Sequence, residues 1–190
     1  MKADSDLSVR DVLYAVYSLQ EYGRATLFHG DYYQKGFFAN RNHFKGIQNE
    51  SRRVAIRLIK QPCIICGEPL SDRSVYDHLV PTAEGGRKSS TNIMPLCRNH
   101  NSSKGKKDLL TWDGWWNSCE KLPMETTLDI LCVYAREKYY TKKQQNRLDE
   151  PANDAEIDGL MKLGKMVLPA GLVSDYYSAM LEGIKIWQTE

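Results

Sequence analysis

The sequence predicts an α+β fold in which a small ββα centre is flanked by helices on both sides. The centre is expected in residues 61–105, which are dense in Cys, Gly, Pro, Asn and Ser and therefore favour short elements joined by turns. Within it, residues 74–80 and 92–96 have the composition of short strands, and the polar run from Arg98 favours a helix. Apolar residues recur at helical spacing before and after this segment, which predicts the flanking helices.

The flanking helices are predicted from apolar periodicity and from residues that start or stop a helix. Residues 8–22 carry an apolar stripe, and Ser8 is placed to cap the helix. Residues 28–45 are aromatic and basic with two glycines, which favours a loop or a short hairpin. The linker between helices is expected at Asp149–Asp154. Further helices are expected at residues 47–60, 106–118, 126–146, 153–166 and 172–187.

Composition and charge indicate an ordinary globular chain with an uneven charge distribution. Hydrophobic residues make up 42% and charged residues 26% of the 190 residues, which does not resemble a disordered chain. No run is long and apolar enough to cross a bilayer and the first ten residues lack a signal-peptide core, so we expect a cytoplasmic protein without a membrane partner. Residues 1–110 carry 17 Lys and Arg against 11 Asp and Glu, whereas residues 111–190 carry 9 against 13. The first part therefore suits a polyanionic partner.

Four residues have the spacing of a structural zinc site. Cys63 and Cys66 form one pair and Cys97 and His100 form a second, each with two residues between the ligands. A tetrahedral Zn²⁺ with three thiolates and one imidazole has no open position for water, so we expect this ion to stabilise the fold. An alternative places His100 in the active site. The remaining cysteines, Cys119 and Cys132, lack ligand spacing and are expected to be buried thiols.

Between and after the two pairs lie residues that suit phosphodiester hydrolysis. Such a reaction needs a base near neutral pH, which histidine supplies, and His78 lies in this segment. It also needs a hard cation, and Mg²⁺ prefers oxygen ligands such as those of Asp77 and Asn101. Asn92 has a side chain that can orient a histidine. Alternatively, Asn92 and Asn101 are turn and cap residues, since Asn101 lies where a helix could begin.

The stretch DHLVPTAEGGRKSSTNIMPLCRNHNSSK resembles the motif of HNH endonucleases, which have the ββα-metal fold. The resemblance covers residues 63–105, about a quarter of the chain. It implies that His78 is the general base, that Asp77 and Asn101 bind a catalytic Mg²⁺ or Mn²⁺, and that Asn92 orients His78. One position departs from the common pattern, because the second zinc pair is CxxH where zinc-bearing relatives usually have CxxC. Strict strand alternation would also send Asp77 and His78 to opposite faces of a strand.

We expect the chain to consist of three segments, two of which contain residues that contact DNA. Residues 1–60 form a helical and loop region with DNA contacts, residues 61–107 the nuclease motif, and residues 108–190 a helical region for dimerisation or scaffolding. Double-stranded DNA is the expected partner. Alternatively, the basic residues form a solvated surface that does not contact DNA, and the expected dimer surface packs in the core. Trp112, Trp115 and Trp116 are expected to pack in the core. The predicted DNA-binding residues are Lys104, Lys106, Lys107, Arg41, Arg52 and Arg53.

The function implied by the resemblance is metal-dependent cleavage of DNA. The long flanks favour a site-specific enzyme of the restriction type that acts as a homodimer. The first alternative is a homing, phage or mobile-element nuclease. Two alternatives lack catalysis: a zinc-stabilised nucleic-acid-binding module, and an interaction protein that keeps the motif only as a scaffold.

Overall fold

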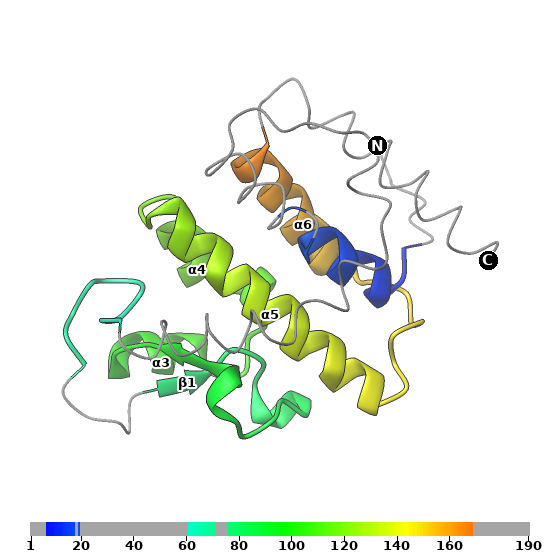
Figure 1. Ribbon diagram of the computed structural model, residues 1–190, viewed down its shortest axis with the longest axis horizontal. Coiled ribbons are helices and arrows are strands. Elements are labelled where there is room, and N and C mark those ends of the chain that lie inside the picture. Colours follow the sequence, from blue (N-terminus) through cyan, green and yellow to red (C-terminus); the bar gives the residue numbers. More distant parts are fainter. Residues whose placement is uncertain (1–6, 18, 20–60, 71–75, 169–190) are drawn as a thin grey trace.

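A computed structural model describes residues 7–17, 19, 61–70 and 76–168 of the chain. The long helix α5 (Met124–Gln144) crosses the middle of this structure (Figure 1). The ββα unit lies on one side of α5, and helix α6 (Asp154–Val167) lies on the other side together with the helical residues 9–17. In these ranges no helix combines the length and the apolar character needed to cross a membrane.

The predicted ββα centre is present. Strand β1 (Tyr76–His78) pairs with strand β2 (Ile93–Pro95) in antiparallel register, with Asp77 opposite Met94 and His78 opposite Ile93. Helix α3 (Arg98–Lys104) follows β2 directly, so all three elements of the unit lie within 29 residues of chain, from 76 to 104. The fold is thus α+β, and helical residues both precede and follow the unit along the chain.

The connection between the two strands turns tightly at Gly85 and Gly86, and its geometry favours glycine at both positions. It contains two short 3-10 helices, η3 (Thr82–Glu84) and η4 (Ser90–Asn92). Gly85 ends η3 with a φ of 86°, in the left-handed region that favours glycine. A Cβ atom on Gly86 would lie 2.0 Å from the Val80 carbonyl oxygen, so only glycine fits there.

The segment predicted as one helix at 106–118 is two elements. Asp108 caps the 3-10 helix η5 (Leu109–Thr111) by accepting a hydrogen bond from the Leu110 amide. Trp112 then has an extended backbone, and α4 (Asp113–Cys119) begins after it. The prediction was wrong here because the carboxylate of Asp108 starts a new element within the apolar periodicity.

The aromatic residues around α4 belong to the core, as predicted. Trp112 and Trp115 are buried and Trp116 packs against the core from its edge. The Trp112 indole donates a hydrogen bond of 3.3 Å to Ser103 on α3, which ties α4 to the ββα unit. Cys119 and Cys132 are buried thiols, also as predicted.

The N-terminal helix and the α5–α6 connection hold each other in place. Ser8 caps the helix as predicted, since its hydroxyl accepts from the Asp11 amide while the Asp11 carboxylate accepts from Ser8. Residues 7–10 and residues 148–152 are joined by three backbone hydrogen bonds, two of which form an antiparallel β-bridge between Ser8 and Pro151. The segment expected as a linker, Asp149–Asp154, is therefore an exposed connection held to the N-terminal helix by backbone hydrogen bonds. One hydrophobic core spans residues from Leu7 to Leu168.

Candidate active site and metal centre

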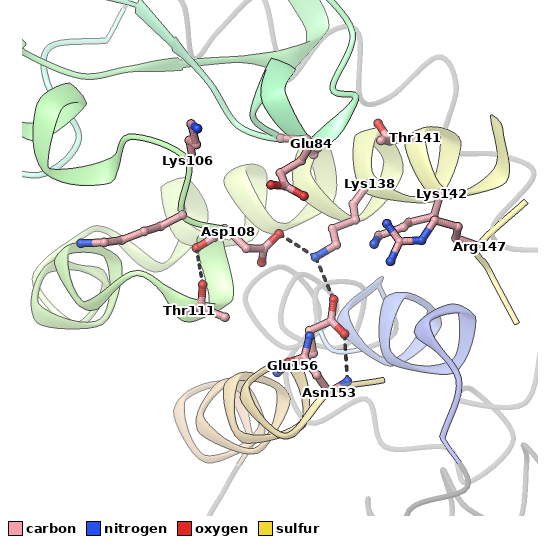
Figure 2. Close-up of a pocket in the computed structure, with 12 residues that line it drawn as sticks. Glu84, Lys106, Asp108, Thr111, Lys138, Thr141, Lys142, Arg147, Asn153 and Glu156 are labelled. Carbon is pink, nitrogen blue, oxygen red and sulfur yellow. Dashed lines mark hydrogen bonds and ion pairs between the residues drawn. The ribbon is translucent and has the colours of Figure 1, made fainter. Parts of the chain in front are cut away.

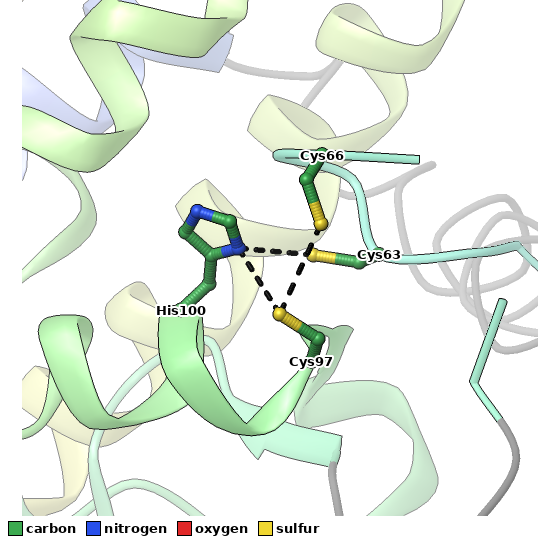
Figure 3. Close-up of side chains that lie close together, drawn as sticks. All are labelled: Cys63, Cys66, Cys97 and His100. Carbon is green, nitrogen blue, oxygen red and sulfur yellow. Dashed lines mark hydrogen bonds between the residues drawn. The ribbon is translucent and has the colours of Figure 1, made fainter. Parts of the chain in front are cut away.

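Three sulfurs and one imidazole nitrogen converge beside α3 (Figure 3). The four ligand atoms all lie within 4.8 Å of one another. His100 Nδ1 lies 3.1 Å from Cys97 Sγ and 3.5 Å from Cys63 Sγ, and Cys66 Sγ lies 3.9 Å from Cys97 Sγ. Around a tetrahedral zinc, sulfurs are separated by about 3.8 Å and sulfur and nitrogen by about 3.6 Å. The cluster therefore has the size and the donor set of a structural Cys₃His zinc site.

Local backbone geometry builds this cluster from two short pieces. The first pair lies on a turn closed by the Gly67 amide, which donates to the Cys63 carbonyl over 2.7 Å, and Gly67 has a φ of 74°. The Ile64 amide donates to the Pro95 carbonyl, which fastens this turn to the end of β2. Cys97 is the N-cap residue of α3 and His100 lies one turn later on the same helix face.

The ionisation of the Cys63 and Cys66 thiols depends on burial and on their close approach to each other. Burial opposes ionisation of Cys63, but the amides of Cys97, Cys66 and Ile65 outweigh it, so the pKa of the Cys63 thiol is lowered. Desolvation and the neighbouring Cys63 thiol raise the pKa of Cys66 to about 11. A divalent cation relieves this repulsion between sulfurs, because zinc binds thiolates and displaces their protons.

The end of β1 brings together Asp77, His78 and Lys104. Lys104 Nζ donates a 2.7 Å hydrogen bond to the His78 carbonyl and lies 3.1 Å from Asp77 Oδ2. Asp77 Oδ1 accepts from the His78 amide over 2.7 Å. Lys104 thus connects α3 to both residues of the predicted Asp-His pair. The structure corrects the prediction that Lys104 contacts DNA, because its side chain is fully buried and its ammonium faces the protein.

Asn92 forms hydrogen bonds with the backbone that follows His78. Its side chain is fully buried, and Oδ1 accepts from the Val80 amide over 2.9 Å. Both amide hydrogens are used, since Nδ2 donates to the Val80 and Arg87 carbonyls, each over 2.9 Å. These bonds end two residues after His78, so they fix the loop at the end of β1 and do not reach the imidazole.

The oxygen donors of Asp77 and Asn101 suit a hard cation. Asp77 Oδ2 is buried and accepts no hydrogen bond in the described structure, so part of its lone-pair capacity is open beside the Lys104 ion pair. Asn101 lies one turn before Lys104 on α3. The alternative that Asn101 caps a helix is wrong, since α3 begins at Arg98 with Cys97 as its N-cap.

Comparison with known proteins agrees with this arrangement. A family model described as HNH endonuclease matches residues 63–107. Residues 63–107 form an HNH endonuclease domain. The match begins at the first zinc-ligand candidate and ends three residues after Lys104, so it contains every site residue described above. No curated protein and no solved structure matches the chain.

The HNH domain is anchored to α5 by an ion pair that sequence reasoning missed. The Glu137 carboxylate on α5 is fully buried, and Arg87 from the strand connection binds it through Nε and Nη2 at 2.7–3.1 Å. Thr91 adds a hydroxyl bond of 2.9 Å to the same carboxylate. No spacing in the sequence could reveal this contact, because Arg87 and Glu137 are 50 residues apart in different elements.

The remaining predicted DNA-binding residues fall into two groups, one described by the structure and one outside the described residues. Lys106 and Lys107 are exposed on the segment after α3, which is compatible with a DNA contact. The predicted contacts at Arg41, Arg52 and Arg53 lie outside the described residues, as do the predicted elements at 28–45, 47–60 and 172–187.

Proposed function

We propose that this chain is an endonuclease that hydrolyses phosphodiester bonds of double-stranded DNA, with His78 as its general base. The observation that carries the proposal is the cluster at the end of β1, where Lys104 fixes the Asp77 carboxylate and the His78 backbone inside a domain of the HNH type. A zinc-stabilised binding module does not need a buried lysine at that position. His78 itself is half-buried, so the residue is not closed off from solvent.

The chain's own residues would prepare the attack on the phosphorus atom. His78 would accept a proton from the attacking water, a role that suits imidazole because it titrates near neutral pH. Asn92 would hold the loop that follows His78, so that the histidine keeps a fixed position. Asp77 and Asn101 would hold Mg²⁺ or Mn²⁺. That cation, when bound, would neutralise charge on the phosphate and on the departing 3′ oxygen.

We propose further that cleavage is site-specific, as in a restriction enzyme, and that the active form is an intracellular homodimer. The segments outside residues 63–107 make up most of the chain, more than a minimal nicking module requires. Two copies related by a twofold axis would present one active site to each DNA strand. A homing, phage or mobile-element nuclease is the alternative within the same chemistry.

Plasmid cleavage tests the nuclease proposal. Zinc-loaded protein is incubated with supercoiled plasmids of different sequence, with Mg²⁺ and without it. We expect cutting only with Mg²⁺, and a loss of at least about 100-fold in His78→Ala, because a general base contributes that much or more to the rate. Discrete fragments would support a site-specific enzyme, whereas a smear would contradict it.

A matched histidine variant separates catalysis from folding. His100→Ala removes a zinc-ligand candidate and should lower stability, whereas His78→Ala should keep the melting temperature of the wild type. Folded, zinc-loaded wild-type protein that cuts none of the plasmids would favour the non-catalytic binding module. Cleavage by His78→Ala at the wild-type rate would contradict the role of His78 as base.

A further inference from the structure

A polar cavity of about 360 Å³ opens beside the HNH domain (Figure 2). Its walls come from the loop after β1, the segment after α3, the last turns of α5 and the start of α6. Five cationic side chains line it against three carboxylates, which leaves an excess of two positive charges. The cations are Lys106, Lys107, Lys138, Lys142 and Arg147, and the carboxylates are Glu84, Asp108 and Glu156.

Two of the three carboxylates, Asp108 and Glu156, are already paired with one lysine, and the three groups together carry one negative charge. Lys138 Nζ lies 2.6 Å from Asp108 Oδ2 and 2.9 Å from Glu156 Oε1, at the centre of Figure 2. The Tyr134 hydroxyl also donates to Asp108, over 2.7 Å. This network is complete within the protein, so Lys138 is not available to a ligand.

Lys142 and Lys106 are the cavity cations whose ammonium groups make no ion pair or hydrogen bond within the described residues. Lys142 is half-buried and lies one turn after Lys138 on α5. Desolvation, followed by the positive charges of Lys138 and Arg147, lowers the pKa of Lys142. Of the other excess cations, Arg147 pairs with Glu150 at the surface and Lys107 donates to the Ser103 carbonyl. A bound anion would offset the repulsion that Lys142 experiences.

The cavity adjoins the active site on two walls. Val80, which lines it, is two residues after His78, and Lys106 is two residues after Lys104. Two residues of chain span at most about 7 Å. Successive phosphates on one DNA strand are separated by about 3.4 Å along the helix axis. A duplex bound at His78 therefore has neighbouring phosphates within reach of the cavity.

We propose that this cavity binds a backbone phosphate of the DNA substrate, held by Lys142 together with Lys106. The ligand is a phosphodiester a short distance along the strand from the bond that is cut. The contact supplies affinity and register and carries no sequence information, because phosphates are the same at every base pair. This inference rests on the proposed function, since it takes the substrate to be DNA.

The test measures binding without cleavage. A fluorescent duplex of about 30 base pairs is titrated with zinc-loaded full-length protein in the absence of Mg²⁺, over a series of salt concentrations. Loss of one phosphate contact should weaken binding by about 8-fold at 0.1 M salt and reduce the slope of log K against log salt by about 0.9. We expect both changes for Lys142→Gln, and wild-type behaviour for Lys142→Arg.

Lys143→Gln is the matched control, because Lys143 is the next residue on α5, is exposed and does not line the cavity. It should bind DNA like the wild type. Equal affinities for Lys142→Gln and Lys143→Gln would overturn the proposal even if the wild type cuts DNA. If Lys142→Gln has a lowered melting temperature, Lys106→Gln at an exposed position provides the same comparison, and its equality with Lys143→Gln would overturn the proposal equally.

Inorganic phosphate distinguishes the source of the anion. At constant ionic strength, phosphate that raises the melting temperature of the wild type but not of Lys142→Gln, with unchanged DNA affinity in that variant, would overturn the assignment to a phosphodiester. A wild type that shows the Lys142 effect on binding but cuts no plasmid would support the phosphate site while contradicting the nuclease proposal.

Discussion

At the scale of single residues, Lys104 shows how burial decides a role. Its ammonium is fully buried between the Asp77 carboxylate and the His78 carbonyl. Removing one partner of a buried ion pair leaves the other charge unpaired, which typically costs 3–5 kcal/mol. Because Asp77 keeps 16% of its side chain exposed, we expect the smaller loss of about 3 kcal/mol for Lys104→Met, measured by urea unfolding.

Lys106→Met is the control for that measurement, because it removes the same charge from an exposed position two residues away. It should change the free energy of unfolding by less than about 0.5 kcal/mol. If both variants unfolded at the same urea concentration, Lys104 would contribute no more than a surface lysine, and its placement between Asp77 and His78 would need another explanation.

The sequence predicted the site residues that are recognisable by their spacing along the chain. It did not predict the contacts that form when separate elements pack together. Ligand spacing found Cys63, Cys66, Cys97 and His100, because two ligands on one turn or one helical turn meet without help from distant elements. The contacts of Lys104 and of the Arg87–Glu137 pair depend on how separate elements pack. Spacing along the chain contains no information on such packing, so the DNA contact expected of Lys104 was wrong.

At the scale of elements, the Cys₃His cluster lies where the pieces of the ββα unit meet. The turn at 63–67, the end of β2 and the start of α3 meet at the cluster, while each strand has only three residues. Cys97→Ser removes a ligand that also begins α3. We expect its zinc content to fall well below the wild-type value of about one per chain, with a lower melting temperature.

Cys132→Ala is the control for the zinc measurement, since Cys132 is a buried thiol on α5 outside the cluster. It should keep its zinc, as measured by elemental analysis of the purified protein. A Cys97→Ser protein that retains the wild-type zinc content would show that the cluster is not the binding site.

Helix prediction succeeded where caps and periodicity agree. α6 was expected at 153–166 and spans Asp154–Val167, because Asn153 and Glu156 form a capping box before an apolar stripe. The helix expected at 106–118 is interrupted, because Asp108 caps η5 and also accepts from Lys138 and Tyr134. That second use of Asp108 depends on α5, which lies 16 or more residues further along the chain.

At the scale of the whole molecule, Lys138 joins three elements. From α5 it pairs with Asp108 ahead of η5 and with Glu156 on α6, and its side chain is 8% exposed. Lys138→Met would leave two carboxylates close together without a cation. We expect a loss of about 3–5 kcal/mol in the free energy of unfolding at pH 7, and less than about 0.5 kcal/mol for the exposed control Lys143→Met.

The pH dependence of this loss follows from the pKa values of the two partners. Burial raises the pKa of Asp108, but Lys138 and hydrogen bonds outweigh it, so the folded pKa lies below the ordinary value of 3.8. Its contribution to stability is therefore present above pH 3.8 and lost as the pH falls through the folded pKa. Burial lowers the pKa of Lys138, but Asp108 and Glu156 outweigh it, so the folded pKa exceeds 10.5, and its contribution persists up to that pH.

The difference in stability between wild type and Lys138→Met should thus be constant from about pH 7 to pH 9 and should shrink as the pH falls toward 3, because burial without Lys138 raises the pKa of Asp108 in the variant. The acid side gives the sharper comparison, because protonation of Asp108 removes the ion pair in the wild type and relieves the unpaired carboxylate in the variant. Urea unfolding of the wild type and of Lys138→Met at pH 3, 5, 7 and 9 measures the difference in their free energies of unfolding. A difference that stays constant down to pH 3 would mean that Lys138 stabilises the molecule through packing of its alkyl chain and not through its charge.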